Sequence, residues 1–134
     1  GGVNVASALN GSKTVNLEQV YAWDPEVIFI NNFCPYVPKD FYNNAIKGYD
    51  WSSVSAVKNK RVHKFPLGMY RWYPPAGDAP LSLLWAAKCL QPELFADVDM
   101  AQAMKDYYRR FYGYELTDGD VEHICTPPRE AAIY

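Results

Sequence analysis

The chain has 134 residues and a nearly balanced charge, with a formal net charge of −2 at pH 7. This length suits one domain with a buried core of its own. Apolar residues make up 49% of the chain, which favours folding over disorder. The charge provides no basic surface, which excludes nucleic acid as a main partner. No apolar run is long enough to span a bilayer.

The start of the chain and its cysteines say little about the chemical function of the protein. It opens with GGVNVASALNG, without an initiator methionine or a signal peptide, which indicates a fragment or a processed product. Cys34, Cys89 and Cys125 fit neither a metal-ligand spacing nor a disulfide framework. The 11 tyrosines and 4 tryptophans are more informative, because such rings pack in cores while their polar atoms serve interfaces and ligands.

The first part of the chain predicts two helices followed by a strand. Residues 3–9 predict a short helix. A second helix follows over residues 17–23, with Asn16 as its N-cap and the Asp24-Pro pair as its end. The continuous apolar run at residues 27–30 predicts a strand that is buried on both faces, as strands of parallel sheets are.

The next segment repeats this order of helix and strand. A helix is predicted over residues 39–47, with Gly48 after its last turn. Residues 51–57 predict a turn or short helix, and residues 61–65 predict a second strand. A long proline-containing loop over residues 66–77 then follows the strand.

The second half of the chain begins with two longer helices. Asp78 is the predicted cap of a helix over residues 79–90, which is apolar nearly all round and is therefore expected to pack deeply. Asp97 or Asp99 caps the next helix, and Gly113 ends it. Its apolar residues recur at helical spacing and predict a buried stripe: Met100, Ala103, Met104, Tyr107, Tyr108 and Phe111.

The chain closes with one more helix and a tail. Thr117 and Asp120 form a capping pair for a short final helix, and residues 126–134 are expected to be an extended tail. Alternating helices and strands favour an α/β fold. We expect residues 1–125 to form a three-layer, Rossmann-like unit with a short, mainly parallel sheet flanked by helices.

A ligand site is expected where the two strands end, because ligands of open parallel sheets lie beyond the carboxyl ends of the strands. Seven side chains on the two strand-end loops are candidates for ligand contact: Asn32, Phe33, Tyr36, Tyr70, Arg71, Trp72 and Tyr73. Arg71 is the first choice, because its planar guanidinium can hold a carboxylate, a catecholate or an oxyanion through two bonds. The alternative is a surface arginine stacked on Trp72.

Structural roles compete with ligand contact for several of these residues. Asn32 could bond a ligand or its own backbone, and one or more of the loop aromatics could simply pin the loop. His63 suits a strand face, and His123 near Cys125 lacks the further ligands that a structural metal site needs. We therefore predict neither a metal site nor a catalytic residue.

Four segments, in this order and spacing, resemble a known family. They are VNLEQVYAWDPEVIFI at residues 15–30, AVKNKRVHKFP at 56–66, APLSLLWAAKCLQPELFADVD at 79–99 and YRRFYGYELTD at 108–118. Together they are similar to the C-terminal lobe of the substrate-binding proteins of ABC importers. The matching class is the periplasmic binding proteins that handle ferric siderophores, haem and cobalamin.

The resemblance implies a function in solute capture, with no catalysis and no cofactor of the protein's own. In this family the ligand lies between two α/β lobes, so a missing N-terminal lobe would supply the other half of the site. The ligand would be a ferric siderophore or a related iron or metal chelate. The partner would be an ABC permease, and the parent protein would be periplasmic or extracellular and membrane-anchored. An acidic residue of each lobe docks on the permease in this family. Asp78 lies near the matching stretch, with helix capping as its alternative role.

Other ligands and functions stay open. Molybdate or tungstate would also suit Arg71, and haem could use Tyr36, Met69 or Tyr70. An α/β enzyme of the chelatase type is the second functional hypothesis. The sequence has no glycine-rich phosphate loop and no nucleophile with a base at recognisable spacing, which counts against it. A pure interaction domain is the third. An isolated lobe would leave its cleft wall uncovered, which predicts a homodimer.

Overall fold

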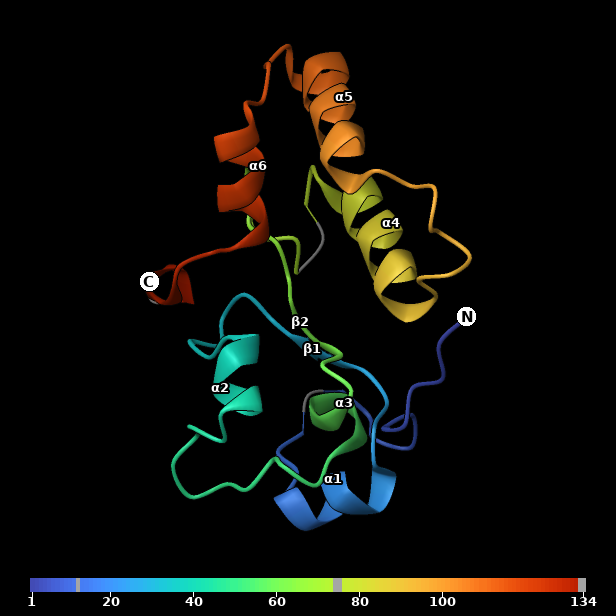
Figure 1. Ribbon diagram of the computed structural model, residues 1–134, viewed down its shortest axis with the longest axis vertical. Coiled ribbons are helices and arrows are strands. Elements are labelled where there is room, and N and C mark those ends of the chain that lie inside the picture. The colour runs from blue at the N-terminus through green and yellow to red at the C-terminus, as the bar shows by residue number, and fades with distance from the viewer. Residues whose placement is uncertain (12, 74–75, 133–134) are drawn as a thin grey trace. The chain divides into compact units, whose positions relative to one another are not determined.

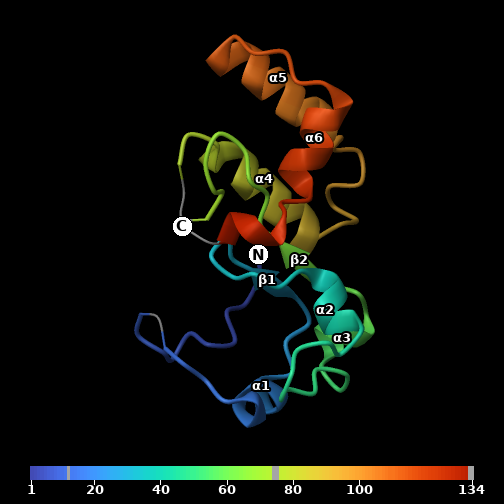
Figure 2. The same ribbon diagram turned by 90° about the vertical axis from the view of Figure 1, so that its left-hand side faces the viewer.

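The computed structural model describes residues 1–11, 13–73 and 76–132 of the chain. Its contacts divide the chain into two compact units. Unit 1 comprises Gly1–Ile30 and Tyr36–His63, and unit 2 comprises Asn31–Pro35 and Lys64–Tyr134. Figures 1 and 2 show the helices and strands of these units from two directions.

The sheet is short and parallel. In the described part of the chain it consists of β1 (Ile28–Ile30) and β2 (Val62–Lys64), which lie side by side in both views (Figures 1 and 2). The Ile28 N–H donates to the Arg61 carbonyl at 3.1 Å, just before β2 begins. Both strands fall within the predicted ranges, and the predicted α/β class is confirmed.

The first helix in the described part of unit 1 follows its prediction closely and is linked to a later helix. The helix α1 (Leu17–Trp23) begins as predicted, because the Asn16 side chain accepts from Gln19 N–H at 2.8 Å. It ends at Asp24, whose φ of 39° is left-handed. The Asp24 carboxylate then accepts the backbone N–H of Ser55 at 2.8 Å, at the start of α3 (Ser55–Lys58). The backbone of Asp24 thus ends α1, and its side chain binds the first backbone N–H of α3.

Two helix predictions in unit 1 are corrected. The helix α2 (Pro38–Tyr42) stops before residue 47, since the chain turns at Asn44 with a left-handed φ of 50°. Residues 3–9 form turns instead of a helix, with short-range bonds such as Ser7 N–H to the Asn4 carbonyl at 3.1 Å. The buried hydrophobic residues of unit 1 are Ile30, Phe41, Ile46, Val54, Ala56, Val57 and Val62.

The helices of unit 2 lie close to the predicted bounds. They are α4 (Ala79–Leu90), α5 (Met100–Tyr112), α6 (Asp118–Cys125) and the short 3₁₀ helix η1 (Arg129–Ala132). Asp99 caps α5 by accepting from Gln102 N–H at 3.0 Å, and Gly113 ends it with a φ of 64°. The capping pair of Thr117 and Asp120 is present at α6.

The tail and the packing of the helices differ from the predictions. The tail is not extended throughout, because η1 forms within it; its last two residues lie outside the described part. The helix α4 packs less deeply than expected, since Leu83 is 73% exposed. On α5, Met104 and Tyr108 are buried as predicted, whereas Phe111 is 59% exposed.

The core of unit 2 gathers side chains from the loop after β2 and from α4, α5, α6 and the segment before α6. Its buried members are Trp72, Leu81, Met104, Tyr108, Leu116, Val121 and Ile124. The helix α5 packs against both α4 and α6. None of the helices in the described ranges has the length and apolar character that crossing a membrane requires.

The substitution Met104→Ala tests the core of unit 2. Met104 is 1% exposed, so the truncation leaves a cavity and is expected to lower the free energy of unfolding by about 2–5 kcal/mol. Urea denaturation measures the change. The matched control is Met69→Ala, whose side chain is 67% exposed and whose loss is expected to cost less than about 0.5 kcal/mol. Equal costs for the two variants would contradict this assignment of the core.

Candidate functional site

The loops that follow the two strands are joined by one buried side chain in unit 2. Asn32 is 4% exposed. Its amide nitrogen donates to the carbonyls of Phe65 at 2.8 Å and Pro66 at 3.1 Å, and its amide oxygen accepts the backbone N–H of Tyr73 at 3.1 Å. The hydrogen-bonding atoms of Asn32 thus hold the two loops together, and ligand contact by this residue stays a prediction.

The loop after β2 folds back on itself as a small hairpin. Leu67 and Arg71 form an isolated antiparallel bridge, and the Trp72 N–H donates to the Pro66 carbonyl at 3.3 Å. The Leu67 N–H donates to the carbonyl of Ile124 in α6 at 2.8 Å. We call residues 67–73 the ligand loop. Hydrogen bonds hold its backbone at the two ends of the hairpin, and one more bond attaches it to α6.

Arg71 lies between aromatic rings from both loops. Its guanidinium carbon is 4.9 Å from the ring centre of Phe33 and 5.5 Å from that of Tyr70. Both separations suit cation–π attraction. The side chain is 8% exposed overall, and its Nη2 donates to the Ala131 carbonyl of η1 at 2.6 Å. The guanidinium thus packs against Phe33 and Tyr70, and not against Trp72 as the alternative role of a surface arginine supposed.

The aromatic candidates divide by burial. Trp72 is 1% exposed and donates its indole N–H to Asp78 Oδ2 at 3.2 Å, so it belongs to the core of unit 2, and its role in ligand contact stays a prediction. Phe33 is 38% exposed, and Tyr70 and Tyr73 are each 45% exposed. Tyr36 is 39% exposed and belongs to unit 1. Phe33 and Tyr70 are therefore exposed rings beside Arg71, whereas the exposed ring of Tyr73 packs on Phe65, with ring centres 5.5 Å apart.

Asp78 is a buried carboxylate. It is 1% exposed and stands at the N-cap position of α4, yet its side chain makes no capping bond there. Its Oδ2 accepts from Met69 N–H at 3.0 Å and from Tyr108 O–H at 3.0 Å, and its Oδ1 accepts from Tyr112 O–H at 3.1 Å. The prediction of side-chain capping is corrected, because the carboxylate is surrounded by other donors, and permease docking by Asp78 stays a prediction.

Tyr108 and Tyr112 are the partners of Asp78 that sequence reasoning missed. Burial is the main cause that raises the pKa of Tyr108 well above its usual value. Burial, followed by the hydrogen bond to Asp78, raises the pKa of Tyr112 to about 12. The available signal was their spacing of four residues on α5, which places both hydroxyls on the same helix face. Both therefore stay protonated at neutral pH and donate to the carboxylate.

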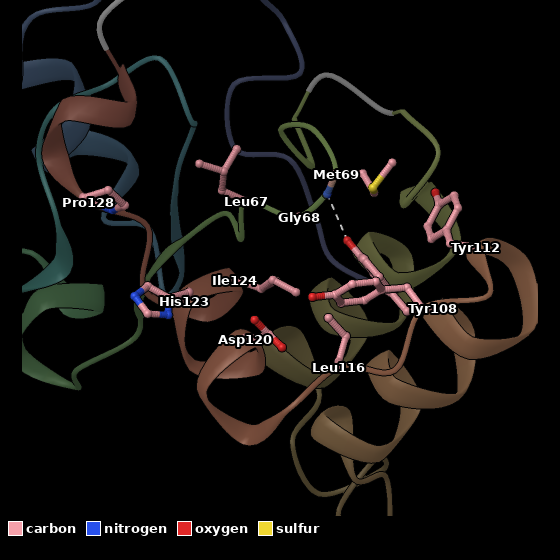
Figure 3. A pocket seen from close by; sticks show the side chains of 11 residues that line it. Leu67, Gly68, Met69, Tyr108, Tyr112, Leu116, Asp120, His123, Ile124 and Pro128 are labelled. Carbon is pink, nitrogen blue, oxygen red and sulfur yellow. Dashed lines mark hydrogen bonds between the residues drawn. The ribbon is translucent and has the colours of Figure 1, made fainter.

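A cavity of about 610 Å³ lies on the inner side of the ligand loop (Figure 3). Its lining comprises Leu67, Gly68, Met69, Tyr108, Tyr112, Tyr114, Leu116, Asp120, His123, Ile124 and Pro128. Most of these side chains are apolar or aromatic. The Asp120 carboxylate accepts the N–H of Thr117 at 2.8 Å, and this bond contributes most to lowering the pKa of Asp120. The acidic group in the wall is thus occupied with capping α6.

A metal site requires several ligand side chains close together. In the described ranges, no three His, Cys, Asp or Glu side chains gather where they could hold an ion. No disulfide joins Cys34, Cys89 or Cys125. The cationic side chain among the exposed rings is Arg71, which suits an anion better than a cation.

Comparisons with known proteins identify the kind of lobe. No protein-family model matches the chain. A periplasmic solute-binding protein from Veillonella parvula superposes with a TM-score of 0.86 at 38% identity, over 92% of this chain and 38% of that one. The molybdate-binding protein MolA of Haemophilus influenzae is 37% identical over 114 residues, which is 84% of this chain and 31% of MolA.

Two further structures carry bound solutes. MolA bound to molybdate superposes with a TM-score of 0.65. Helicobacter pylori CeuE with Ni(II) bound superposes with a TM-score of 0.60 at 33% identity, over 84% of this chain and 34% of CeuE. The chain spans about a third of the length of these relatives.

The chain is therefore a mixed α/β lobe of the kind found in periplasmic solute-binding proteins of ABC transporters. The resemblance predicted from its sequence motifs is confirmed. The relatives are binding proteins and not enzymes, and they carry transported ligands rather than cofactors.

Gly68→Ala tests the close approach of the ligand loop to Asp78. A Cβ on Gly68 would lie 2.3 Å from both Asp78 Oδ2 and Tyr108 Oη. Such overpacking is expected to lower the free energy of unfolding by about 1–3 kcal/mol in urea denaturation. The matched control is Gly119→Ala, whose Cβ would have its nearest neighbour at 3.7 Å. A Gly68→Ala variant as stable as the control would contradict the close approach.

The raised tyrosine pKa values predict a loss of stability in alkali. An unfolded tyrosine titrates near pH 10, whereas Tyr112 titrates near 12 in the fold. The stability that this shift provides is present below pH 10 and is lost as pH rises through about 12. Urea midpoints from pH 9 to 12 should fall for the native chain and fall less for Tyr112→Phe. Parallel curves would contradict the prediction.

Proposed function

We propose that the chain is one lobe of the solute-binding component of an ABC importer and that it presents Arg71 to an anionic ligand. The observation that carries this proposal is the position of the guanidinium, stacked between Phe33 of one strand-end loop and Tyr70 of the other. A cation held among rings and away from bulk water interacts strongly with an anion, because little solvent screens the charge. Capture of a solute requires these residues only to bind it and not to catalyse a reaction.

Molybdate is the ligand that we propose to test first. The relative MolA is a molybdate-binding protein, and a guanidinium fork matches the oxygens of an oxyanion in charge and in hydrogen bonding. A ferric siderophore, or a related iron chelate with anionic oxygens, is the second candidate. Phe33, Tyr70 and Tyr73 would provide aromatic contact for such a larger ligand.

Partners and location are proposed from the relatives. The structure of MolA with molybdate concerns an ABC transporter of Haemophilus influenzae, and we propose an ABC permease as the partner of this chain. We likewise propose a periplasmic site, with a membrane anchor on the parent protein, and a second lobe that covers the ligand. A homodimer of the isolated lobe is proposed as well, and light scattering across protein concentration would detect it.

Calorimetric titration of the protein at its full natural length tests the ligand class. Sodium molybdate is expected to bind saturably, and Arg71→Lys to weaken the affinity by about tenfold or more, because a bond to a charged group is lost. The matched control, Arg110→Lys on the exposed part of α5, is expected to change the affinity by no more than about twofold.

The other ligands in the panel are a ferric catecholate siderophore, haem and Ni²⁺. Binding of the siderophore alone, weakened by Arg71→Lys, would select the second candidate. Binding of Ni²⁺ alone, or molybdate binding that Arg71→Lys leaves unchanged, would overturn the proposal of an anion held by Arg71.

A further inference from the structure

The ligand loop is held on both sides of Arg71 by the buried carboxylate of Asp78, and on one side by Tyr108 as well. Two residues before Arg71, the Met69 N–H donates to the Tyr108 hydroxyl at 2.9 Å and to Asp78 Oδ2 at 3.0 Å. The bond to Tyr108 is the dashed line in Figure 3. One residue after Arg71, the indole N–H of Trp72 donates to the same Asp78 oxygen at 3.2 Å.

Asp78 and Tyr108 also bond to each other. The Tyr108 hydroxyl donates to Asp78 Oδ2 at 3.0 Å and, with its lone pairs, accepts the Met69 N–H. Trp72 and Asp78 are each 1% exposed, and Tyr108 is 4% exposed. A buried carboxylate is costly unless donors surround it. Two of the donors here come from the ligand loop, so the carboxylate favours one conformation of that loop.

The packing around Gly68 shows how closely the loop approaches this pair. A methyl group at that position would overlap Asp78 Oδ2 and the Tyr108 hydroxyl, each at 2.3 Å. The loop therefore lies directly against Asp78 and Tyr108, with no room for a side chain between them. Movement of the loop away from this position would break the Met69 and Trp72 bonds together.

We infer that Asp78 and Tyr108 are positioning residues that fix the ligand loop, and with it the backbone of Arg71, before a ligand arrives. The inference rests on the proposed function, because it assigns the order of the loop to ligand binding. A preformed site avoids the cost of ordering a loop on association. Loss of either group is therefore expected to reduce ligand affinity without removing any ligand contact.

The first test compares two conservative variants of neighbouring tyrosines. Tyr108→Phe removes a hydroxyl that bonds both Asp78 and the ligand loop, whereas Tyr112→Phe removes a hydroxyl that bonds Asp78 Oδ1 and has no bond to the loop. Tyr108→Phe is expected to speed hydrogen exchange of the Met69 amide, followed by NMR, by about tenfold. It is also expected to weaken molybdate binding by about three- to tenfold. Tyr112→Phe should change both by no more than about twofold.

The second test separates shape from charge at position 78. In Asp78→Asn, the side-chain oxygen can still accept from Met69, Trp72 and Tyr108. The side-chain NH₂ group takes the place of Oδ1 and can donate to the Tyr112 hydroxyl. Its molybdate affinity is expected to stay within about threefold of the native value. Asp78→Ala is expected to lose tenfold or more, with rapid exchange at Met69. A positioning role requires this rescue by asparagine; equal losses in both variants would overturn it.

The remaining outcomes distinguish this inference from the proposed function. Native exchange at Met69 in Tyr108→Phe would overturn the inference, since the hydroxyl would then not hold the loop. Faster exchange with unchanged affinity would overturn it as well, because loop order would not matter to the ligand. If the native protein binds no probe at all, the proposed function fails, and exchange at Met69 still decides whether Tyr108 and Asp78 fix the loop.

Discussion

The structure of the candidate site depends on one buried carboxylate. Asp78 gathers the Met69 amide, the Trp72 indole and the hydroxyls of Tyr108 and Tyr112. Burying this group without partners would cost several kcal/mol, so its donors must stay in place for the fold to be stable. They come from the ligand loop and from α5, and the carboxylate itself begins α4. A single carboxylate thereby joins the ligand loop and the start of α4 to α5, which lies about thirty residues further along the chain.

A second polar residue performs the same task on the other side of the site. The Asn32 amide uses both its nitrogen and its oxygen to join the two strand-end loops. Arg71 and Phe33 meet because this link brings their loops together. Asn32 and Asp78 thus hold the loops in place, while the exposed rings and the stacked guanidinium are the groups that we propose for binding.

Local patterns predicted the elements well, whereas long-range partners escaped prediction. The bounds of α4 and the caps of α1, α5 and α6 follow from capping residues and apolar spacing within a few positions. The short α2 and the inward Asp78 do not, because distant contacts decide them. Asp78 is an ordinary N-cap residue by sequence, and donors that include Tyr108, thirty positions later, make the inward orientation favourable. The motifs nevertheless revealed the resemblance to the family, because they depend on the order of helices and strands and not on long-range contacts between side chains.

The position of Trp72 has a spectroscopic consequence. The indole is 1% exposed, bonded to Asp78 and 6.5 Å from the Trp85 ring centre in an edge-on arrangement. It is therefore shielded from dissolved quenchers, and excitation energy can pass between the two indoles. The loop that carries the candidate ligand residue also carries its own chromophore. Near-ultraviolet circular dichroism of this ring pair would report the order of the loop in solution, without any label and in the absence of a ligand.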